Sequence, residues 1–433
     1  MTLKYVAEIR DPIHGYIKIT AAERELIDSP FVQRLRRIHQ LAGAYLVYPG
    51  GVHTRFEHVL GTMHVAGLIG LSLTDKAGLK DDDIQQLRMA GLLHDIGHGP
   101  FSHLFEEVLA ERTDLTHEDL SQRIVGESSV GDILKRNGFS PTKLSSLCVG
   151  KARGSPFLNQ VIAGGLSADM MDYLLRDTYF TGVEYGKVDI HRVIDSIDVS
   201  PSGQLMLDRA ALYAFEALLI ARYEMFKAVY FHRTVRAAEL MLAHSMILAD
   251  RELHLTDLSR IDRILRLADE VVLQQLADLP PRNSELKIAQ KLATSYAQRR
   301  LVKCVYEKVV QRKDRTIQRV FSKKKFRDEL ATDIAKSSGA KPTDIYVDAS
   351  NTPSVPYTYE RQAFSSIVLF TNDPRGGRKR IETVPVGELP LVGSITGFMD
   401  ILRVYTVSEQ RQKTLEVVEK IFGKEDFMSR ISV

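Results

Sequence analysis

The chain has 433 residues, of which 44% are hydrophobic and 26% charged, and its formal net charge is +3. Such a chain is long enough for one large domain or two, and this composition is ordinary for a globular protein. The small net charge does not by itself require a nucleic-acid partner.

Two cysteines, Cys148 and Cys304, lie far apart in the sequence. This usage fits a reducing compartment and argues against a disulfide framework. Residues 1–11 contain no apolar run of signal-peptide length, and the longest apolar stretch, Val65 to Leu73, is too short to span a bilayer. We therefore expect a cytoplasmic protein with no membrane partner.

The first predicted element is a short β-hairpin over Tyr5 to Thr20, where the residues alternate around the turn sequence D-P-I-H-G, Asp11 to Gly15. From Ala21 to about Arg300 the pattern is mostly helical. One helix is predicted to begin at the acidic residues 81–83, which suit the positive end of the helix dipole. It ends near His94 and Asp95, because glycines and a proline follow, so these two residues lie at a helix end.

A second informative helix is predicted around Asp169, Asp172, Tyr173 and Arg176, which recur at three- and four-residue spacing and so share one helix face. A polar stripe of this kind is more often solvated than functional. Here it contains two carboxylates and a tyrosine, and the motifs described below direct attention to it.

The composition changes after about residue 300. Three β-like segments, Asp344 to Val347, Ser366 to Phe370 and Ile381 to Val386, are separated by loops rich in Pro, Gly and Asn. The segment Ile395 to Phe422 is predicted to form one or two closing helices. We expect a mainly α fold with a helical core over residues 1–299 and a smaller C-terminal α+β lobe over residues 300–433.

Three phrases contain residue types that bind metal ions. They are H-T-R-F-E-H (His53 to His58), H-D-I-G-H-G-P-F-S-H (His94 to His103) and D-M-M-D-Y-L-L-R-D (Asp169 to Asp177). Two imidazoles and two carboxylates form a mixed N/O set that suits Fe, Mn, Zn, Ni or Mg and leaves positions open for water and substrate. His58 and His94 are 36 residues apart, so tertiary packing must assemble such a site. The alternative is that both are core histidines.

These phrases, together with D-P-I-H-G, F-V-Q-R-L-R-R-I-H-Q-L (Phe31 to Leu41), V-Y-P-G-G-V-H-T-R-F-E-H (Val47 to His58) and residues 222–233, resemble the HD-domain metal-dependent phosphohydrolases. Within that superfamily the chain is similar to the deoxynucleoside triphosphate triphosphohydrolases, the group that includes the animal protein in which a SAM domain is fused to an HD domain. The resemblance covers the first half of the chain well and the last third poorly. It implies an HD-domain helical core, and we expect no SAM domain before it.

The resemblance implies a divalent metal ion bound by His58, His94, Asp95 and Asp169. Such an ion would polarise a phosphoryl oxygen and lower the pKa of a bound water, and Mg²⁺ could accompany the nucleotide. The ligand set alone does not select the metal.

His98, His103, Glu106 and His117 form the next layer of candidates, and the positions that match His103, Glu106 and His117 are associated in the family with proton transfer and water activation. A histidine near neutral pKa suits general acid/base catalysis, and His117 is the strongest candidate. The alternative for each is an orienting residue behind the metal ligands, or a surface histidine. We expect His39, His53, His64, His191, His244 and His254 to have ordinary structural or surface roles.

The positions that hold the nucleotide in the family match Gln40, Arg55, Tyr173, Asp177, Arg222, Tyr230, His232 and Arg233. Arginine can bind phosphate oxygens with two donors, and tyrosine can pack on a sugar that lacks a 2′-hydroxyl. The alternative for Arg222 and Arg233 is salt bridging on a helix surface. The chain departs from the family at Met170, where a basic residue often contacts phosphate, and this leaves room for another phosphoester.

Asp28, Gln33 and Arg36 match a guanine-selective regulatory pocket of several family members, which implies a GTP or dGTP activator and a homo-oligomer, a dimer or tetramer. The alternative is a helix start with solvated charges. The basic stretches Arg299–Arg300, Lys323 to Arg327 and Arg378 to Arg380 are expected to be solvated, with nucleotide phosphates at a subunit interface or nucleic acid as the rival partners.

The resemblance therefore implies an allosteric, metal-dependent hydrolase that converts a deoxynucleoside triphosphate to deoxynucleoside and triphosphate. One alternative is an HD-type phosphohydrolase that acts on another nucleotide or a phosphomonoester. An alternative of another class is a non-catalytic scaffold that senses nucleotides or binds nucleic acid.

Overall fold

The computed structural model describes residues 3–154, 156–311, 321, 323–349, 366–372, 379–395 and 398–424. The chain begins with the predicted antiparallel hairpin, β1 (Tyr5–Asp11) and β2 (Gly15–Thr20), in which Asp11 pairs with Gly15 across the turn. Gly15 has a φ of +76°, a backbone conformation that glycine adopts without steric cost. Ile17 and Ile19 of β2 are buried against the helices that follow.

The residues after this hairpin, up to residue 299, form mostly helices, as predicted. These are α1 (Ala21–Ile27), α2 (Pro30–Arg34), α3 (Arg55–Ser72), α4 (Thr74–Ala77), α5 (Asp81–Leu93), α6 (Leu104–Leu109), α7 (His117–Glu127), α8 (Ser129–Arg136), α9 (Pro141–Leu147), α10 (Pro156–Ile162), α11 (Ala168–Thr181), α12 (Ile190–Asp195), α13 (Leu212–Met225), α14 (Arg233–Leu253), α15 (Asp269–Ala277) and α16 (Ser284–Ala297). Short 3-10 helices cover Leu35–Arg37, Ala42–Leu46, Arg209–Ala211 and Ile261–Arg266, and a π-helical turn covers Phe226–Tyr230.

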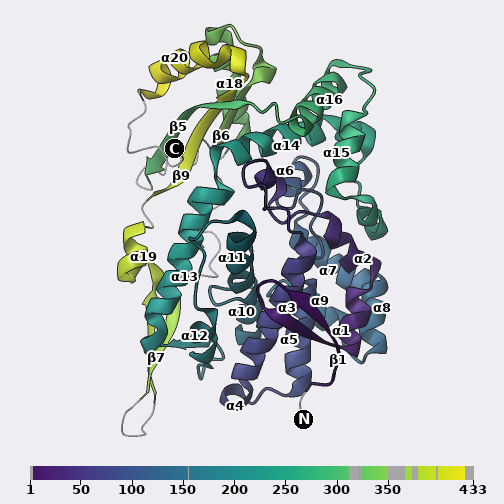
Figure 1. Cartoon of the computed structure of the whole chain (residues 1–433), viewed down its shortest axis with the longest axis vertical. Coiled ribbons are helices and arrows are strands. Elements are labelled where there is room, and N and C mark those ends of the chain that lie inside the picture. The colour runs from purple at the N-terminus through teal and green to yellow at the C-terminus, as the bar shows by residue number, and fades with distance from the viewer. Residues whose placement is uncertain are drawn as a thin grey trace.

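Three of these helices, α3, α5 and α11, lie next to one another in the core (Figure 1). The side chain of Glu57 accepts a hydrogen bond from the backbone of Thr54 at the start of α3, 2.9 Å, and Asp83 does the same for Lys80 at the start of α5, 3.0 Å. These caps satisfy backbone donors that a helix start otherwise leaves without partners.

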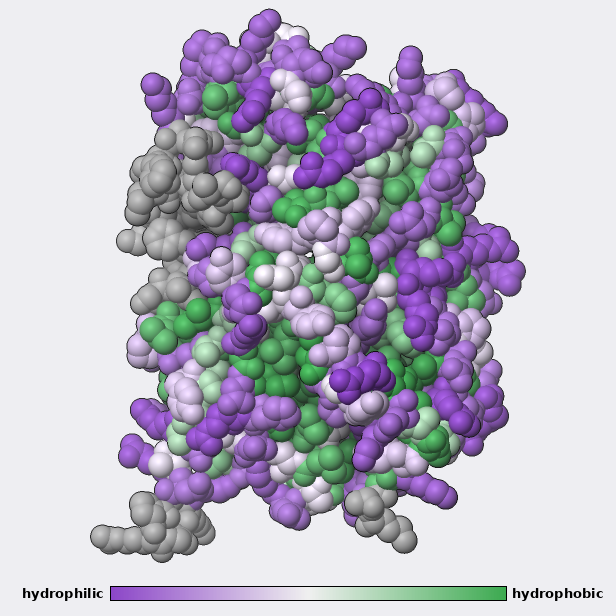
Figure 2. Space-filling model, viewed as in Figure 1, coloured by the Kyte–Doolittle hydropathy of each residue, from purple (hydrophilic) through white to green (hydrophobic). Residues whose placement is uncertain are grey.

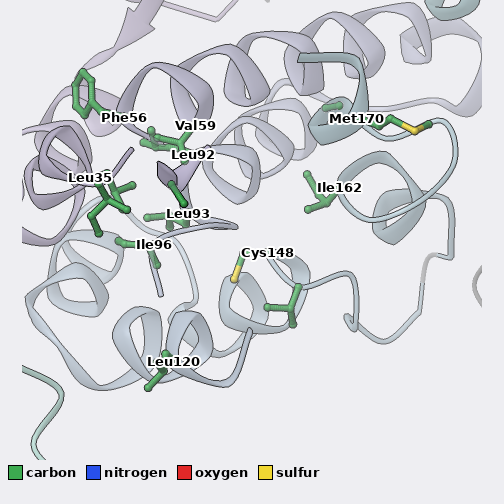
Figure 3. Close-up of a cluster of buried hydrophobic side chains, with 14 of the residues drawn as sticks. Leu35, Phe56, Val59, Leu92, Leu93, Ile96, Leu120, Cys148, Ile162 and Met170 are labelled. Carbon is green, nitrogen blue, oxygen red and sulfur yellow. The ribbon is translucent and has the colours of Figure 1, made fainter. Parts of the chain in front are cut away.

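Apolar side chains from these helices and their neighbours form a buried cluster (Figure 3). Val59 of α3 lies close to Leu92 and Leu93 at the end of α5, and all three are buried. Cys148, Ile162 and Met170 belong to the same buried cluster. The end of α5, where His94 and Asp95 follow, therefore rests on a close-packed base.

The C-terminal lobe contains a three-stranded antiparallel sheet in the order β5 (Lys303–Gln311), β9 (Phe398–Thr406), β6 (Ile345–Ala349). Helices α18 (Lys324–Ser338) and α20 (Arg411–Phe422) pack on it at the top of the molecule (Figure 1). The mainly α fold with an N-terminal hairpin and a C-terminal α+β lobe is thus confirmed.

The prediction of closing helices from Ile395 to Phe422 is wrong in its first half. Residues 398–406 form the central strand β9, and only 411–422 form a helix. Ile401, Leu402, Val404 and Tyr405 are all buried, because a central strand covered on both faces loses the alternation by which a strand is recognised.

A further sheet joins distant parts of the chain. The short hairpin of β3 (Ile197–Val199) and β4 (Leu205–Asp208), which the sequence analysis missed, pairs through β4 with β7 (Ser366–Thr371), and β7 pairs with β8 (Arg380–Pro385). The pairing of β4 with β7 is parallel and sets Met206 opposite Val368. Helix α19 (Pro390–Ile395) follows β8. Residues from both sides of position 300 therefore share one sheet, and the division into two domains there stays a prediction.

Among the described residues, no helix is both long and apolar enough to cross a membrane. The surface in the view of Figure 1 is hydrophilic along most of its rim, with a hydrophobic area below the middle (Figure 2). Exposed apolar side chains such as Tyr213 and Leu391 are ordinary on a protein surface.

Candidate active site

The four predicted metal ligands come together from three helices. His58 lies on α3, His94 and Asp95 follow α5, and Asp169 lies in the first turn of α11. His58 Nε2 is 3.2 Å from Asp169 Oδ1 and 3.6 Å from Asp95 Oδ2. His94 Nε2 is 3.3 Å from Asp95 Oδ1 and 3.6 Å from Asp169 Oδ1. The ligand atoms of His58, His94 and Asp95 lie within 4.8 Å of one another, and Asp169 Oδ1 adjoins this group beside the two imidazoles.

The chemistry of this donor set fits a divalent cation. The Nδ1 atom of each ring is engaged, that of His58 by Asp172 at 2.8 Å and that of His94 by the carbonyl of Gly91 at 2.8 Å. Both Nε2 atoms are buried and have no hydrogen-bond partner among the described residues. A hydrogen bond at Nδ1 fixes the tautomer that leaves the Nε2 lone pair free for a metal.

The electrostatic field at this point is negative. Burial alone would lower the pKa of His58, but the adjacent carboxylates of Asp169 and Asp172 raise it to about 10. Burial opposes the ionisation of Asp169, but the two histidines hold its pKa well below the ordinary value. The carboxylates that attract a proton here would equally attract a cation.

Arg55 at the start of α3 is buried and donates from Nη1 to Asp95 Oδ2. Its Nε donates to Ser102 Oγ at 2.8 Å, and its Nη2 has no partner among the described residues. Burial opposes the ionisation of Asp95, but Arg55 and the neighbouring histidines hold its pKa well below the ordinary value. Asp95 is therefore an ionised candidate ligand, with one oxygen bonded to Arg55.

An unusual turn after the H-D pair brings the next histidines close. Phe101 and Ser102 both have left-handed backbones, with φ of +60° and +59°. The backbone N–H of Phe101 donates to Asp269 Oδ1 at 2.7 Å, and Ser102 Oγ donates to the carbonyl of His39 at 2.6 Å. These tertiary bonds hold a conformation that non-glycine residues rarely adopt, and such strain tends to occur at functional sites.

The predicted acid/base residues form a second cluster beside the first. His117 opens α7 and its Nδ1 makes a short hydrogen bond to Glu106 Oε1. His103 Nδ1 lies 3.4 Å from the same oxygen, and the ring of His98 stacks on that of His117 with centroids 4.0 Å apart. His98 Nε2 is 3.3 Å from Asp95 Oδ1, so this cluster touches the metal ligands. His103 is largely exposed, at 71% of its side chain, whereas His98 is buried.

These groups differ in charge state. Burial opposes the ionisation of Glu106, but the hydrogen bonds with His103 and His117 hold its pKa well below the ordinary value. Burial would lower the pKa of His117, but the bond to Glu106 raises it. Burial, followed by the charge of Arg55, holds the pKa of His98 well below its ordinary value, so His98 is neutral where His117 carries a proton.

Several candidate phosphate and sugar residues gather around α11, the helix that carries Asp169. Arg222 on α13 makes a short hydrogen bond to the hydroxyl of Tyr173, and its Nη1 is 3.7 Å from the sulfur of Met170. Tyr230 donates to Asp177 Oδ2 at 2.6 Å. The tyrosine rings are 6.4 Å apart, and burial raises the pKa of both, so both keep their hydroxyl protons.

Two protein families match this chain. Residues 55–155 match the HD domain family, and residues 188–365 match the family described as HD associated region. The first range contains His58, His94, Asp95 and the candidate acid/base residues. This chain belongs to the HD-domain phosphohydrolases.

Its relatives include proteins with and without a stated activity. An uncharacterized protein of Methanocaldococcus jannaschii is 36% identical over 62% of this chain and 57% of its own length. The deoxynucleoside triphosphate triphosphohydrolase SAMHD1 of Bos taurus is 28% identical over 79% of this chain and 64% of its own length, and the Dictyostelium discoideum homolog is 30% identical over 78% and 66%. The chain thus spans less than two thirds of these curated relatives. The crystal structure of a hypothetical protein from Aquifex aeolicus has a TM-score of 0.73 and 28% identity over 95% of this chain and 99% of that one.

The remaining predicted nucleotide residues, Gln40, His232 and Arg233, lie outside the range that matches the HD domain. Gln40 is half-buried, and its Oε1 has no hydrogen-bond partner among the described residues. His232 caps α14 through the backbone N–H of Thr234 and lies edge-on to the ring of Tyr48. Arg233 is the first residue of α14 and is half-buried.

Asp28, Gln33 and Arg36 lie close together, at the surface of the HD domain. Gln33 donates to the carbonyl of Ile27 at 2.8 Å, and Arg36 Nε donates to Gln33 Oε1 at 2.9 Å. The Arg36 guanidinium stacks 3.5 Å above the ring of Phe56, and Asp28 is exposed at the end of α1. Whether they form a guanine pocket stays a prediction.

Several predicted basic residues have partners within the chain. Arg299 donates to the carbonyl of Leu46, Arg327 to that of Phe321, and Lys324 pairs with Glu111 at 2.7 Å. Lys379 pairs with Asp198, and Arg378 lies outside the described residues. The ion pairs of Lys324 and Lys379 offset part of the positive charge that a nucleic acid could use.

Residues behind the metal ligands were not predicted to have a role there. Asp172 accepts hydrogen bonds from His14, His58 and Arg176. Burial opposes its ionisation, but Arg176 and the two histidines hold its pKa well below the ordinary value. Two sequence features could have indicated this network: the D-P-I-H-G motif, which contains His14, and the four-residue spacing of Asp172 and Arg176. His53, expected to be ordinary, bonds Asp177 at 2.7 Å and so also adjoins the site.

Proposed function

We propose that this HD-domain protein hydrolyses deoxynucleoside triphosphates to deoxynucleoside and triphosphate, with a divalent metal ion bound by His58, His94, Asp95 and Asp169. The observation that carries the metal site is the pair of buried Nε2 atoms, without hydrogen-bond partners, beside two ionised carboxylates. Such nitrogens cost free energy unless a ligand satisfies them. When bound, a divalent ion supplies charge neutralisation at the phosphoryl oxygens and makes a water more acidic.

The choice of substrate is supported by two arginines near the candidate ligands. Arg55 donates to Asp95 and has one free donor, Nη2, and Arg222 bonds Tyr173 on the helix that carries Asp169. Two guanidinium groups at separate places suit a polyphosphate held along its length. The names of the SAMHD1 relatives give the same substrate class.

Proton transfer is assigned to the cluster of His117 and Glu106. In the proposed reaction water attacks the α-phosphorus, the bond from that phosphorus to O5′ breaks, and O5′ takes up a proton. His117 is a suitable donor because Glu106 keeps it protonated above its ordinary range. His98, buried and neutral, lies between this pair and Asp95.

A second candidate substrate is another nucleotide or a phosphomonoester. The observation that favours it is Met170, which is buried and sets a thioether, not a cation, beside Arg222. A site with one cation fewer neutralises a long polyphosphate less well.

The test is to incubate the purified protein with each dNTP and each NTP in Mn²⁺ or Mg²⁺ and to separate the products by ion-exchange chromatography. We expect deoxynucleoside and intact triphosphate from dNTPs and little product from NTPs. Orthophosphate with a nucleoside diphosphate, or pyrophosphate with a monophosphate, would reject the proposed scissile bond.

A further inference from the structure

The D-P-I-H-G turn of the N-terminal hairpin reaches the back of the candidate metal site. His14 Nε2 donates to Asp172 Oδ1 at 2.7 Å, and both side chains are almost completely buried. The other oxygen of Asp172, Oδ2, accepts from His58 Nδ1 at 2.8 Å. One carboxylate thus joins the hairpin to a metal ligand that is 44 residues further along the chain.

The Asp172 carboxylate has all its acceptor positions filled. Besides the two histidines, Arg176 donates to it from Nε at 2.9 Å and from Nη2 at 2.8 Å. A carboxylate offers about four lone-pair sites, so four donors fix its position and plane. Loss of His14 would leave Oδ1 with one donor, Arg176 Nη2, instead of two, and so loosen the carboxylate that orients His58.

Asp11 holds the hairpin turn to the same network. Its Oδ1 accepts from the backbone N–H groups of Ile13 and His14, both at 2.9 Å, and its Oδ2 accepts from Arg176 Nη1 at 2.8 Å. The turn is therefore fixed relative to α11, and this places His14 where its Nε2 can donate to Asp172.

We propose that His14 is a positioning residue for the metal ligand His58, acting through Asp172, and that the N-terminal hairpin is for this reason part of the metal centre. His14 does not touch the metal. It holds the carboxylate that fixes the ring of His58 in the orientation and tautomer in which Nε2 faces the ion. The inference rests on the metal site of the proposed function but not on its substrate.

The experiment is a titration of metal-free protein with Co²⁺, followed by the visible absorption of the bound ion, alongside thermal melting without metal. The variants are His14→Ala, His14→Phe, which keeps a ring but has no donor, and His14→Gln, which keeps an N–H donor. His191→Ala removes an exposed histidine elsewhere and is the matched control.

We expect His14→Ala and His14→Phe to bind Co²⁺ roughly 10- to 100-fold more weakly with an altered spectrum, as is usual when a group behind a metal ligand is lost. His14→Gln should recover most of the affinity, and His191→Ala should match the wild type. A folded His14→Ala or His14→Phe protein with wild-type affinity and spectrum would overturn the proposal. So would failure of both to fold, because His14 would then serve the fold and not the ligand. If the wild type itself binds no Co²⁺, the metal site of the proposed function is what fails.

Discussion

At the scale of single residues, the candidate metal site predicts a loss of bound metal when one ligand is changed. His94→Ala and Asp95→Asn should reduce the metal content and lower the hydrolysis rate more than 100-fold, because each removes one of a small set of donors. Asp169→Asn should behave similarly, since an amide is a weaker and neutral ligand. Metal analysis and product chromatography check both effects, and full activity in any of these purified variants would contradict the metal-hydrolase proposal.

The pair of His117 and Glu106 predicts how the rate depends on pH. If protonated His117 is the acid, the rate falls as pH rises through the pKa of His117, which Glu106 raises above the ordinary value of 6.5. Glu106→Gln removes the negative charge and should move this fall to lower pH. The rate on dATP from pH 5.5 to 9.5 measures it for both proteins, and an unchanged alkaline limb in Glu106→Gln would remove His117 from this role.

At the scale of elements, the contact between α3 and α11 depends on Gly61. A Cβ atom at Gly61 would lie 1.8 Å from Asp172 Oδ1 and 2.4 Å from Arg176 Nη2, so the buried pair could not keep its place. We predict that Gly61→Ala destabilises the protein by about 1–3 kcal/mol or more through overpacking and also weakens metal binding. Urea unfolding and the Co²⁺ titration measure the two effects.

Gly126, exposed near the end of α7, is the matched control for this change. A Cβ atom there meets nothing within 4 Å, so Gly126→Ala should stabilise the protein by about 0.5–1 kcal/mol through helix propensity. Equal effects of the two substitutions would show that the approach of α3 to α11 is not tight.

At the scale of the whole molecule, a charged cluster joins the helical core to the C-terminal lobe. Arg236 of α14 donates to both oxygens of Asp348 on β6, at 3.0 and 3.1 Å, and to Glu107 at 2.8 Å. Glu239 lies 3.2 Å from the same guanidinium. Burial raises the pKa of Glu239 to about 7. The attraction of Arg236 opposes this rise, and the repulsion of Glu107 and Asp348 adds to it.

This cluster predicts that stability falls with rising pH. Between the unfolded pKa of 4.5 and the folded pKa of about 7, the folded chain binds more protons at Glu239, so its stability is lost as pH rises through 7. The loss is at most about 3 kcal/mol. Glu239→Gln should therefore stabilise the protein at pH 8 much more than at pH 5 in urea unfolding. Glu329→Gln, exposed on α18, should change little at either pH, and a pH-independent effect of Glu239→Gln would refute the assignment.

The second prediction at this scale concerns assembly through the segment of Asp28, Gln33 and Arg36. GTP or dGTP bound there would shift assembly only if it binds the assembled form better, and assembly would then tighten nucleotide binding in return. A physical link to the active site exists, because Arg34 donates to the carbonyls of Ile96 at 2.9 Å and His98 at 2.6 Å.

We expect GTP to raise the rate on dATP or dCTP and the mass measured by light scattering, and Asp28→Ala to abolish both responses. Lys291→Ala, which changes an exposed basic residue on α16 outside the basic stretches, serves as the control. An unchanged rate and mass in the wild type would mean that this segment is only the start of a helix.

Local chemistry determined much of this protein from the sequence alone. The D-P-I-H-G turn, the acidic start of α5 and the break after Asp95 each depend on residues within a few positions of one another, so each was predictable. The three phrases with metal-binding residues also carried the HD-domain resemblance.

Only the tertiary structure decided which side chains meet. It set His14 and Asp172 in contact across 158 residues and paired β4 with β7, because these contacts depend on how distant segments pack and not on any local pattern. Strand β9 was misassigned because other parts of the chain bury both of its faces, which removes the alternation that marks a strand. The proposed roles of His14, Asp172 and Gly61 depend on the close approach of α3 to α11. In the sequence these residues lie far apart, in the hairpin turn, on α11 and on α3, so no local pattern connects them.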